Sequence, residues 1–354
     1  MKNAVKAAGA PLILTSSHPP AEVCAPLADF TLLSEALGDA PLLCPPAKGK
    51  DFVSLLEHST TCDLRQAIAA FRRHQSVSVY ISLSEKVGLP LALLLRARSV
   101  RTPHVLVAHH LTSAKKKGLQ KRTSWLNAFS RIVVLSEPQE NYLRSEAGYP
   151  EEQTVLLPDS VDTDFWTPQG ARAAHSPERM VLSVGQEHRD YATLFAAARE
   201  MNSVPFMVVA GSAWAARKQI RETLPANVTV LRDLSYGDLR TLYERASVEV
   251  VPLEAEVPFA AGANGLLEAM SMGKATLLTE TPGLSGYLHD GETGRLVPAG
   301  NPKALADAIQ CLHDNPSEAI RLGNKARLAA QTRHSLRRYV TALTHVIREA
   351  QSDK

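Results

Sequence analysis

Short apolar segments rich in valine, isoleucine and leucine recur along the whole chain, and stretches with helical spacing of apolar residues lie between them. Because consecutive residues of these segments are apolar, both faces of each must be buried, as in parallel strands covered by helices. The alternation predicts an α/β fold built from βα units. The expected strands are residues 11–15, 78–82, 104–109, 131–136, 179–185, 205–211, 227–231, 248–253 and 275–279. The expected helices include residues 63–74, 190–200, 236–246, 266–272 and 302–315.

A segment rich in proline, aspartate, serine and glycine, residues 156–179, divides the expected strands into two sets. The 354 residues of the chain are enough for two domains of roughly 100–200 residues each. We therefore predict a first domain over residues 1–160, a second over 161–335 and a C-terminal helical segment over 336–354.

The last stretch of the chain, residues 316–350, is basic and has no strand after it. Its apolar Tyr339, Leu343 and Ile347 follow one another at helical spacing. A helix with one apolar face must be covered, so we expect this helix to pack back across both domains.

Composition excludes several classes of protein. The 39 Lys and Arg residues nearly balance the 36 Asp and Glu residues, so bulk charge predicts no nucleic-acid partner. The cysteines lie far apart with no histidine at metal-ligand spacing, which predicts neither a zinc site nor a disulfide framework. No apolar run approaches the ~20 residues of a membrane span. Gly9 and Pro11 interrupt the apolar N-terminal stretch, so we expect a strand there rather than a signal peptide, and a cytoplasmic protein.

The most informative stretch for chemistry is residues 260–309, which predicts a glycine-containing turn, a helix, a strand and a loop. Small residues stand at the start of this helix, where free backbone N–H groups and the positive end of the helix dipole favour an anion such as a diphosphate. These residues are Gly262, Ala263, Asn264 and Gly265. Glu268 follows one turn later, where its carboxylate can accept hydrogen bonds from ribose hydroxyls. A helix cap at Asn264 and a solvent-facing Glu268 are the alternatives.

Several motifs resemble the retaining family 4 of glycosyltransferases, which have the GT-B fold. LLEAMSMGK and DGETGRLVPAGNPKALADAI resemble the nucleotide-sugar half of that family. SVGQEHRDYATLFAAARE, LRTLYERASVEVVPL and VLLPDSVDTDFWTP resemble three further segments of the same family. The resemblance is strong over about residues 150–340, weaker but ordered over 76–150, and almost silent before residue 76.

The resemblance implies two Rossmann-like domains that face each other across a cleft, with a C-terminal bridging helix. The implied reaction transfers a sugar from a nucleotide-diphosphate sugar, a UDP-sugar by default, to a hydroxyl acceptor that the sequence does not identify. Retention at the anomeric carbon, no metal and no cofactor are further implications. Domain closure over the donor would exclude water.

The resemblance also assigns site residues. His109, in the place of a family histidine at a strand end with Leu111 two residues on, is the expected catalytic residue, and a structural histidine is the alternative. Arg189 takes the place of a phosphate-binding cation, and a surface arginine is the alternative. The expected donor-binding residues are Gly185, Arg189, Gly262, Ala263, Asn264 and Glu268.

Three departures from the family pattern bear on activity. TSSHPPAEV replaces the usual Gly-Gly loop after the first strand, so Ser17 and His18 are the candidates there for contact with acceptor or phosphate. Ala260 stands where the family has the first glutamate of its E-x7-E motif, which holds sugar hydroxyls. Gln186 stands where the family has an arginine. These changes leave two alternatives open: a catalytically silent GT-B protein that binds a nucleotide or a partner, and a nucleotide-sugar epimerase.

A basic run with no acidic residue lies at residues 110–122. It is either a solvated surface or a contact for anionic lipid at the inner face of a membrane, where each cation contributes on the order of 1 kcal/mol. Its cations are Lys115, Lys116, Lys117, Lys121 and Arg122.

Overall fold

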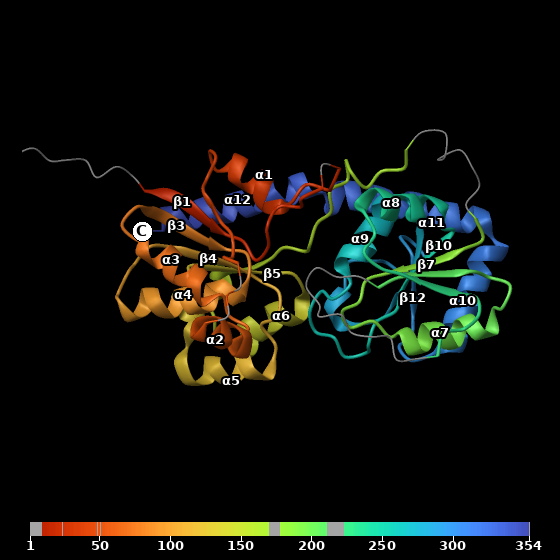
Figure 1. The fold of residues 1–354 in the computed structure, drawn as a ribbon, viewed down its shortest axis with the longest axis horizontal. Coiled ribbons are helices and arrows are strands. Elements are labelled where there is room, and N and C mark those ends of the chain that lie inside the picture. Colours follow the sequence, from red (N-terminus) through yellow and green to blue (C-terminus); the bar gives the residue numbers. More distant parts are fainter. Residues whose placement is uncertain are drawn as a thin grey trace, which may run out of the picture. The chain divides into compact units, whose positions relative to one another are not determined.

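The computed structural model describes residues 9–22, 24–47, 49, 51–169, 178–210 and 223–353. They fall into two compact units (Figure 1). Unit 1 holds the described residues up to Pro20, then Ala28–Leu157, and those from Tyr339 onward. Unit 2 holds the described residues of Ala21–Leu27 and Pro158–Arg338.

Unit 1 is built on a parallel sheet of six strands in the order β2-β1-β3-β4-β5-β6. Its central strands are buried along almost their whole length, as their continuous apolar sequences predict. The strands are β1 Ala10–Leu14, β2 Leu42–Leu43, β3 Val77–Ser82, β4 His104–Ala108, β5 Arg131–Val134 and β6 Thr154–Leu156.

The helices of unit 1 follow the strands as βα units. Helices α3 and α4 pack against each other and against β1, β3 and β4. The helices are α1 Asp29–Ala36, α2 Phe52–Thr60, α3 Leu64–Arg72, α4 Glu85–Ala97, α5 Ala114–Thr123 and α6 Glu137–Asn141. Shorter turns are η1 Trp125–Ala128, η2 Tyr142–Glu146 and η3 Glu151–Gln153.

Unit 2 has a second parallel sheet of six strands, in the order β12-β11-β10-β7-β8-β9. Neighbouring residues of its strands enter different cores: Leu182 packs with α8 and α9, whereas Val181 packs with α7 and α10. The strands are β7 Val181–Val184, β8 Phe206–Val209, β9 Val228–Leu231, β10 Val248–Val251, β11 Ala275–Thr279 and β12 Arg295–Val297. The helices are α7 Tyr191–Glu200, α8 Tyr236–Arg245, α9 Ala263–Ser271, α10 Pro302–Asp314 and α11 Pro316–Arg333, with the short turn η5 Pro282–Leu284.

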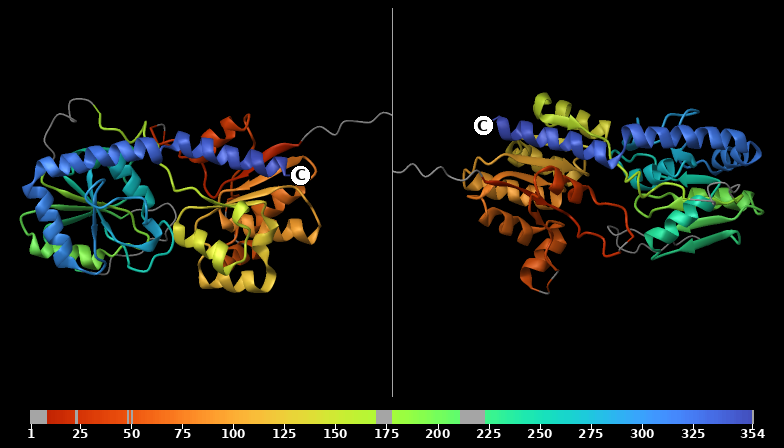
Figure 2. Two further views of the ribbon diagram at one scale, coloured as in Figure 1. Left: turned by 180° about the vertical axis from the view of Figure 1, so that it is seen from behind. Right: turned by 90° about the horizontal axis from the view of Figure 1, so that it is seen from above.

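The C-terminal stretch forms two helices, α11 and α12 (Leu336–Ser352), rather than the single helix expected over 316–350 (Figure 2). The break has a clear cause, because Val161 pairs with the backbone there. Its N–H donates to the carbonyl of His334 at 2.8 Å, and its carbonyl accepts from the N–H of Leu336 at 2.9 Å. The expected apolar face of α12 is confirmed, since Tyr339, Leu343 and Ile347 are buried.

Each sheet reverses its strand order at one point, and that point positions the candidate site. In unit 1, β1 has β2 on one side and β3 on the other. In unit 2, β7 lies between β8 and β10 in the same way. Loops leaving the carboxyl ends of the strands diverge at such a point and leave room for a ligand. Residues that follow β1, β3, β7 and β10 are therefore placed to bind.

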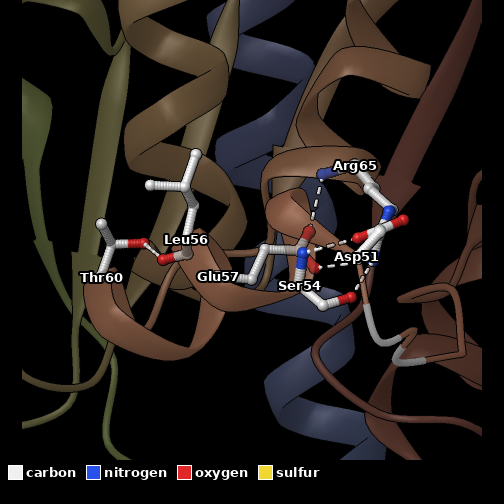
Figure 3. A network of polar contacts seen from close by, with 6 residues as sticks. All are labelled: Asp51, Ser54, Leu56, Glu57, Thr60 and Arg65. Carbon is white, nitrogen blue, oxygen red and sulfur yellow. Dashed lines mark hydrogen bonds and ion pairs between the residues drawn. The ribbon is translucent and has the colours of Figure 1, made fainter.

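The described part of the chain has no helix with the length and apolarity that a bilayer span requires. One helix is nonetheless unusual, because α2 buries none of its residues. Figure 3 shows how it is held: Arg65 at the start of α3 donates to Ser54 at 2.8 Å and to Glu57 at 3.1 Å, and also pairs with Asp51. One polar side thus fixes α2 to the unit.

Candidate functional site

Gly185 and Arg189 meet at the carboxyl end of β7. The backbone of Gly185 has φ +116°, a conformation that side chains with a Cβ rarely adopt. A Cβ at Gly185 would lie 2.7 Å from Cζ of Arg189, so only glycine leaves room for the guanidinium. Arg189 in turn donates from Nη2 to the carbonyl of Val184 at 2.8 Å and from Nη1 to the carbonyl of Glu187 at 3.0 Å.

The same guanidinium lies against the N-terminus of α9. A Cβ at Gly262 would be 3.2 Å from Nη1 of Arg189, and one at Gly265 would be 3.7 Å from Nη2. The structure therefore brings together Gly185, Arg189 and the small residues at the start of α9. Together they form what we call the cationic cradle: Gly185, Arg189, Gly262, Ala263, Asn264 and Gly265.

The N-terminus of α9 has no side-chain cap, because the N-cap residue is Gly262 with φ +90°. Asn264 therefore does not cap the helix, contrary to the alternative considered from the sequence; it is exposed in the first turn. The amides of the first turn of a helix have no acceptor within the helix. Their positive end and Arg189 are thus directed to the same place, which favours an anion.

Arg189 is a half-buried cation whose hydrogen bonds, among the described residues, all go to backbone carbonyls. Burial lowers the pKa of its guanidinium, against opposing charges that include Glu249. No described carboxylate forms an ion pair with it. An arginine that is withdrawn from water without an anionic partner costs free energy, and a bound phosphate would supply that partner.

Glu268 lies one turn into α9 and is not the fully solvent-facing residue of the alternative interpretation. It is half-buried, and its Oε2 accepts a hydrogen bond from the Tyr243 hydroxyl at 3.0 Å. Burial raises the pKa of Glu268 to about 7, although the Tyr243 hydrogen bond and the Arg189 charge lower it. The carboxyl therefore changes its charge near neutral pH.

Glu249 is a residue that the sequence interpretation missed. It lies within β10, is fully buried, and accepts a hydrogen bond at Oε1 from the N–H of Val184 at 3.1 Å. Burial raises the pKa of Glu249 well above its ordinary value, although the hydrogen bond from Val184 and the charge of Arg189 lower it. Val184 links the two residues, because its N–H donates to Glu249 and its carbonyl accepts from Arg189. Glu249 therefore helps to position the backbone that holds Arg189 in the cationic cradle. Glu249 is the single charged residue in the otherwise apolar run VEVV, and this contrast was the sign of it in the sequence.

His109 follows β4 in unit 1 and is half-buried. Its Nε2 lies 3.2 Å from the carbonyl of Leu83, the first residue after β3, and its own carbonyl accepts from the buried Gln139 at 2.9 Å. The imidazole is therefore held at the carboxyl edge of the sheet, next to the point where the strand order reverses. This is the edge on which α/β sheets bind ligands.

Glu85 is a second residue that the sequence interpretation missed. It is buried at the start of α4 and accepts from the N–H of His110 at 2.6 Å and from Lys116 at 3.1 Å. Burial alone would raise its pKa, but the charges of Lys116 and His109 and the His110 hydrogen bond lower the pKa of Glu85 to about 2. Glu85 thus fixes the loop that carries His109.

Ser17 and His18 lie in the loop after β1, with Ser17 half-buried and His18 exposed. The backbone carbonyl of Ser17 accepts a hydrogen bond from Thr15 at 2.7 Å. No side-chain hydrogen bond links either residue to another described part of the chain. Their placement near the carboxyl ends of β1 and β3 is compatible with a ligand contact, and their role stays a prediction.

The five cations of the basic run differ in whether they form ion pairs. Fewer of them are therefore available for a lipid contact than the sequence suggested. Lys116 is paired with buried Glu85. Lys117 is paired with Glu146 at 2.8 Å and lies over the ring of Tyr142. The cations that make no ion pair with any described residue are Lys115, Lys121 and Arg122, all exposed on α5.

No group of three or more His, Cys, Asp and Glu side chains is placed to hold a metal ion within the described ranges.

Comparison with known proteins identifies one family and several similar proteins. Residues 169–329 match the model of the family described as glycosyl transferases group 1. The chain is 28% identical over 264 residues to an alpha-maltose-1-phosphate synthase of Mycobacterium tuberculosis, covering 64% of this chain and 67% of that protein. It is 25% identical over 289 residues to a D-inositol 3-phosphate glycosyltransferase of an Arthrobacter species, covering 73% of this chain and 67% of that protein.

Two solved structures resemble the whole chain. A sucrose-phosphate synthase from Thermosynechococcus elongatus has a TM-score of 0.75 at 20% identity, covering 98% of this chain and 100% of the other. HepE of Anabaena in complex with UDP has a TM-score of 0.74 at 14% identity, covering 96% of this chain and 100% of the other.

The fold and the family match define the class. The predicted GT-B fold is confirmed, and so is the predicted resemblance to glycosyltransferases, with the family match covering residues 169–329. The chain is a glycosyltransferase, and most of unit 2 carries the family domain.

Proposed function

We propose that the chain transfers a sugar from a nucleoside-diphosphate sugar, with UDP-sugars as the first candidates, to a hydroxyl acceptor, with retention and without a divalent metal. The observation that carries the proposal is Arg189, a half-buried cation that lacks an acidic partner among the described residues and lies against the uncapped N-terminus of α9. A diphosphate would complete both groups.

The chemistry follows from this geometry. The bond from the anomeric carbon to the diphosphate oxygen breaks, a bond to the acceptor oxygen forms, and the proton of the acceptor hydroxyl passes to the departing diphosphate. The departing diphosphate gains negative charge, which the α9 dipole and Arg189 stabilise. Glu268, held by Tyr243, accepts hydrogen bonds from the ribose hydroxyls in this proposal. His109 is the proposed catalytic residue on the acceptor side.

HepE of Anabaena, a structural neighbour, binds UDP and UDP-glucose, which supports a uridine nucleotide as the first donor to test. The names of three similar proteins each include a phosphorylated sugar or polyol, namely maltose 1-phosphate, inositol 3-phosphate and sucrose phosphate. Phosphorylated sugars and polyols therefore belong in the first panel of acceptors.

The test is thermal stabilisation by UDP, GDP, ADP and their sugars. A ligand at about a hundredfold excess over its Kd raises the free energy of unfolding by about 2.7 kcal/mol. We expect one nucleotide to stabilise the wild type, and Arg189→Ala and Glu268→Ala to abolish the effect. If no nucleotide stabilises the folded protein, the silent GT-B alternative becomes the better explanation, because Ala260 and Gln186 already favour it.

We also propose a peripheral contact with the anionic inner face of a membrane through α5 and α2. Lys115, Lys121 and Arg122 of α5 face solvent. On α2, Phe52 and Leu55 are 70% and 64% exposed. Leu56 lies outside the Arg65 network in Figure 3.

The end of α2 and the start of α5 are both held at the start of α4. The N–H of Asp63, just after α2, donates to the carbonyl of Lys86 at 2.8 Å, and Lys116 of α5 pairs with Glu85 at 3.1 Å. An apolar ridge beside unpaired cations fits an anionic bilayer.

The membrane contact is tested by sedimentation with phosphatidylserine vesicles and with neutral phosphatidylcholine vesicles. We expect binding to the anionic vesicles alone, with a loss of about tenfold or more in Phe52→Ser/Leu55→Ser. Lys303→Ser, which changes an exposed lysine of unit 2, is the control. Equal binding of the variants and the wild type would contradict this contact, as would binding to neither kind of vesicle.

A further inference from the structure

A pocket of about 260 Å³ lies in unit 2, formed by the loops that leave β7 and β10. None of the donor-binding residues assigned from the sequence lines it. The lining residues are His188, Glu254, Glu256, Val257, Pro258 and Phe259. A pocket of this volume suits one small ring rather than a drug-sized ligand.

The backbone ties this pocket to the cationic cradle. The N–H of Asp190 donates to the carbonyl of Pro252 at 3.0 Å, and the N–H of Glu254 donates to the carbonyl of His188 at 3.1 Å. Between these bonds, Arg189 and Leu253 form an antiparallel bridge. The two loops are thus joined as a short ladder. His188 lines the pocket, and the next residue, Arg189, belongs to the cationic cradle.

The side chains of the pocket have complementary chemistry. Nδ1 of His188 lies 2.8 Å from Oε2 of Glu254, and the rings of His188 and Phe259 meet edge to face with centroids 5.1 Å apart. No described residue makes a hydrogen bond to Oε1 of Glu254. The pocket therefore offers a carboxylate oxygen for hydroxyl donors, an oriented imidazole and one aromatic wall.

We propose that this pocket binds the sugar ring of the nucleotide sugar. Glu254 accepts hydrogen bonds from sugar hydroxyls, His188 orients Glu254, and Phe259 packs against the carbon face of the ring. The inference rests on the proposed function, because it needs a diphosphate at the adjoining cradle. It accounts for a specific departure of this chain: Ala260 supplies no carboxylate, and Glu254 supplies one from the same loop.

The alternative is that the His188–Glu254 pair only holds the two loops together. The two roles predict that substitutions in the pair change the binding of different ligands. A loop-holding pair would support the cradle and hence change the binding of every nucleotide. A sugar-binding pair would change the binding of the nucleotide sugar alone.

The experiment is calorimetric titration of the full chain with UDP and with UDP-glucose, together with GDP and GDP-mannose. We expect Glu254→Gln to weaken nucleotide-sugar binding about tenfold or more, as the loss of hydrogen bonds to a charged group predicts, and to leave nucleotide binding within about twofold. His188→Asn should act in the same direction. Asparagine is chosen because His188 has φ +53°, which asparagine tolerates.

Glu187→Gln is the matched control, since it removes one exposed carboxylate from the same loop outside the pocket. The inference is overturned if Glu254→Gln weakens nucleotide and nucleotide sugar equally, or if it weakens neither. If the wild type binds none of the four ligands, the proposed function itself fails, and the sugar pocket fails with it. Melting temperatures of all variants show whether each remains folded.

Discussion

The cationic cradle can be disturbed by a single methyl group, in the variant Gly185→Ala. The added Cβ would lie 2.7 Å from Cζ of Arg189, and the backbone there has φ +116°. Two effects follow. The left-handed backbone becomes strained, and the guanidinium must leave its place against Val184 and α9.

The two effects have different sizes. Backbone strain of this kind costs about 1–3 kcal/mol, which lowers the melting temperature of a unit of this length by roughly 2–4 °C per kcal/mol. Moving Arg189 is cheap for stability because the guanidinium is the end of a flexible side chain. It is expensive for binding, since hydrogen bonds to a charged group contribute about 1.5–3 kcal/mol. Nucleotide affinity should therefore fall by about 10- to 150-fold.

Thermal denaturation and calorimetric titration with UDP measure both effects. Gly300→Ala is the matched control, because Gly300 also has a positive φ, +64°, and a Cβ there would meet nothing within 4 Å. This control should lose stability and keep its nucleotide affinity. If Gly185→Ala binds UDP as tightly as Gly300→Ala does, Arg189 does not hold the diphosphate and the reasoning is wrong.

Three further predictions concern buried charge. Because the pKa of Glu268 is about 7 and its carboxylate is proposed to bind ribose, nucleotide affinity should fall by up to about tenfold per pH unit below 7. Calorimetry should show a flat profile for Glu268→Gln, and a flat wild-type profile would contradict the proposal.

Glu85→Gln should lower the free energy of unfolding by about 1–3 kcal/mol at pH 7. Because the pKa of Glu85 is lowered from 4.5 to about 2, urea denaturation should show the deficit narrowing as the pH falls between these values, and equal stability at pH 7 would refute it. Arg189→Met should keep or raise the melting temperature without ligand and abolish stabilisation by nucleotide; a large loss of stability would show that Arg189 is mainly structural.

The fold was predictable from the sequence because burial on both faces leaves a continuous apolar run. Strands such as β4 and β11 are therefore visible in the sequence and are confirmed. The short strands β2, β6 and β12 were missed, since two or three residues give no periodicity. The break between α11 and α12 was missed for another reason. It depends on Val161, far away in the chain, pairing with the backbone at His334 and Leu336.

The candidate site was predictable only where neighbours in the sequence are neighbours in space. The start of α9 and Glu268 belong to one helix, so their chemistry is visible in a single motif. Glu249 and Val184 are 65 residues apart, and His188 and Glu254 are 66 apart. These pairs meet because the sheet places β10 beside β7. Sequence spacing carries no sign of that order, and therefore no sign of the pocket.

The loops that have Gln186 and Ala260 in place of the family's arginine and glutamate still carry other groups suited to donor binding. Decay of a binding site removes selection for any group whose presence costs stability, and a half-buried cation without an acidic partner is such a group. Arg189 is kept, together with the two glycines that make room for it and the buried Glu249 that supports its carbonyl partner. The losses at 186 and 260 remove one cation and one carboxylate from the family pattern. The structure retains one of each, Arg189 and Glu254, on adjoining rungs of the short ladder. A rearranged donor site explains this combination better than a lost one.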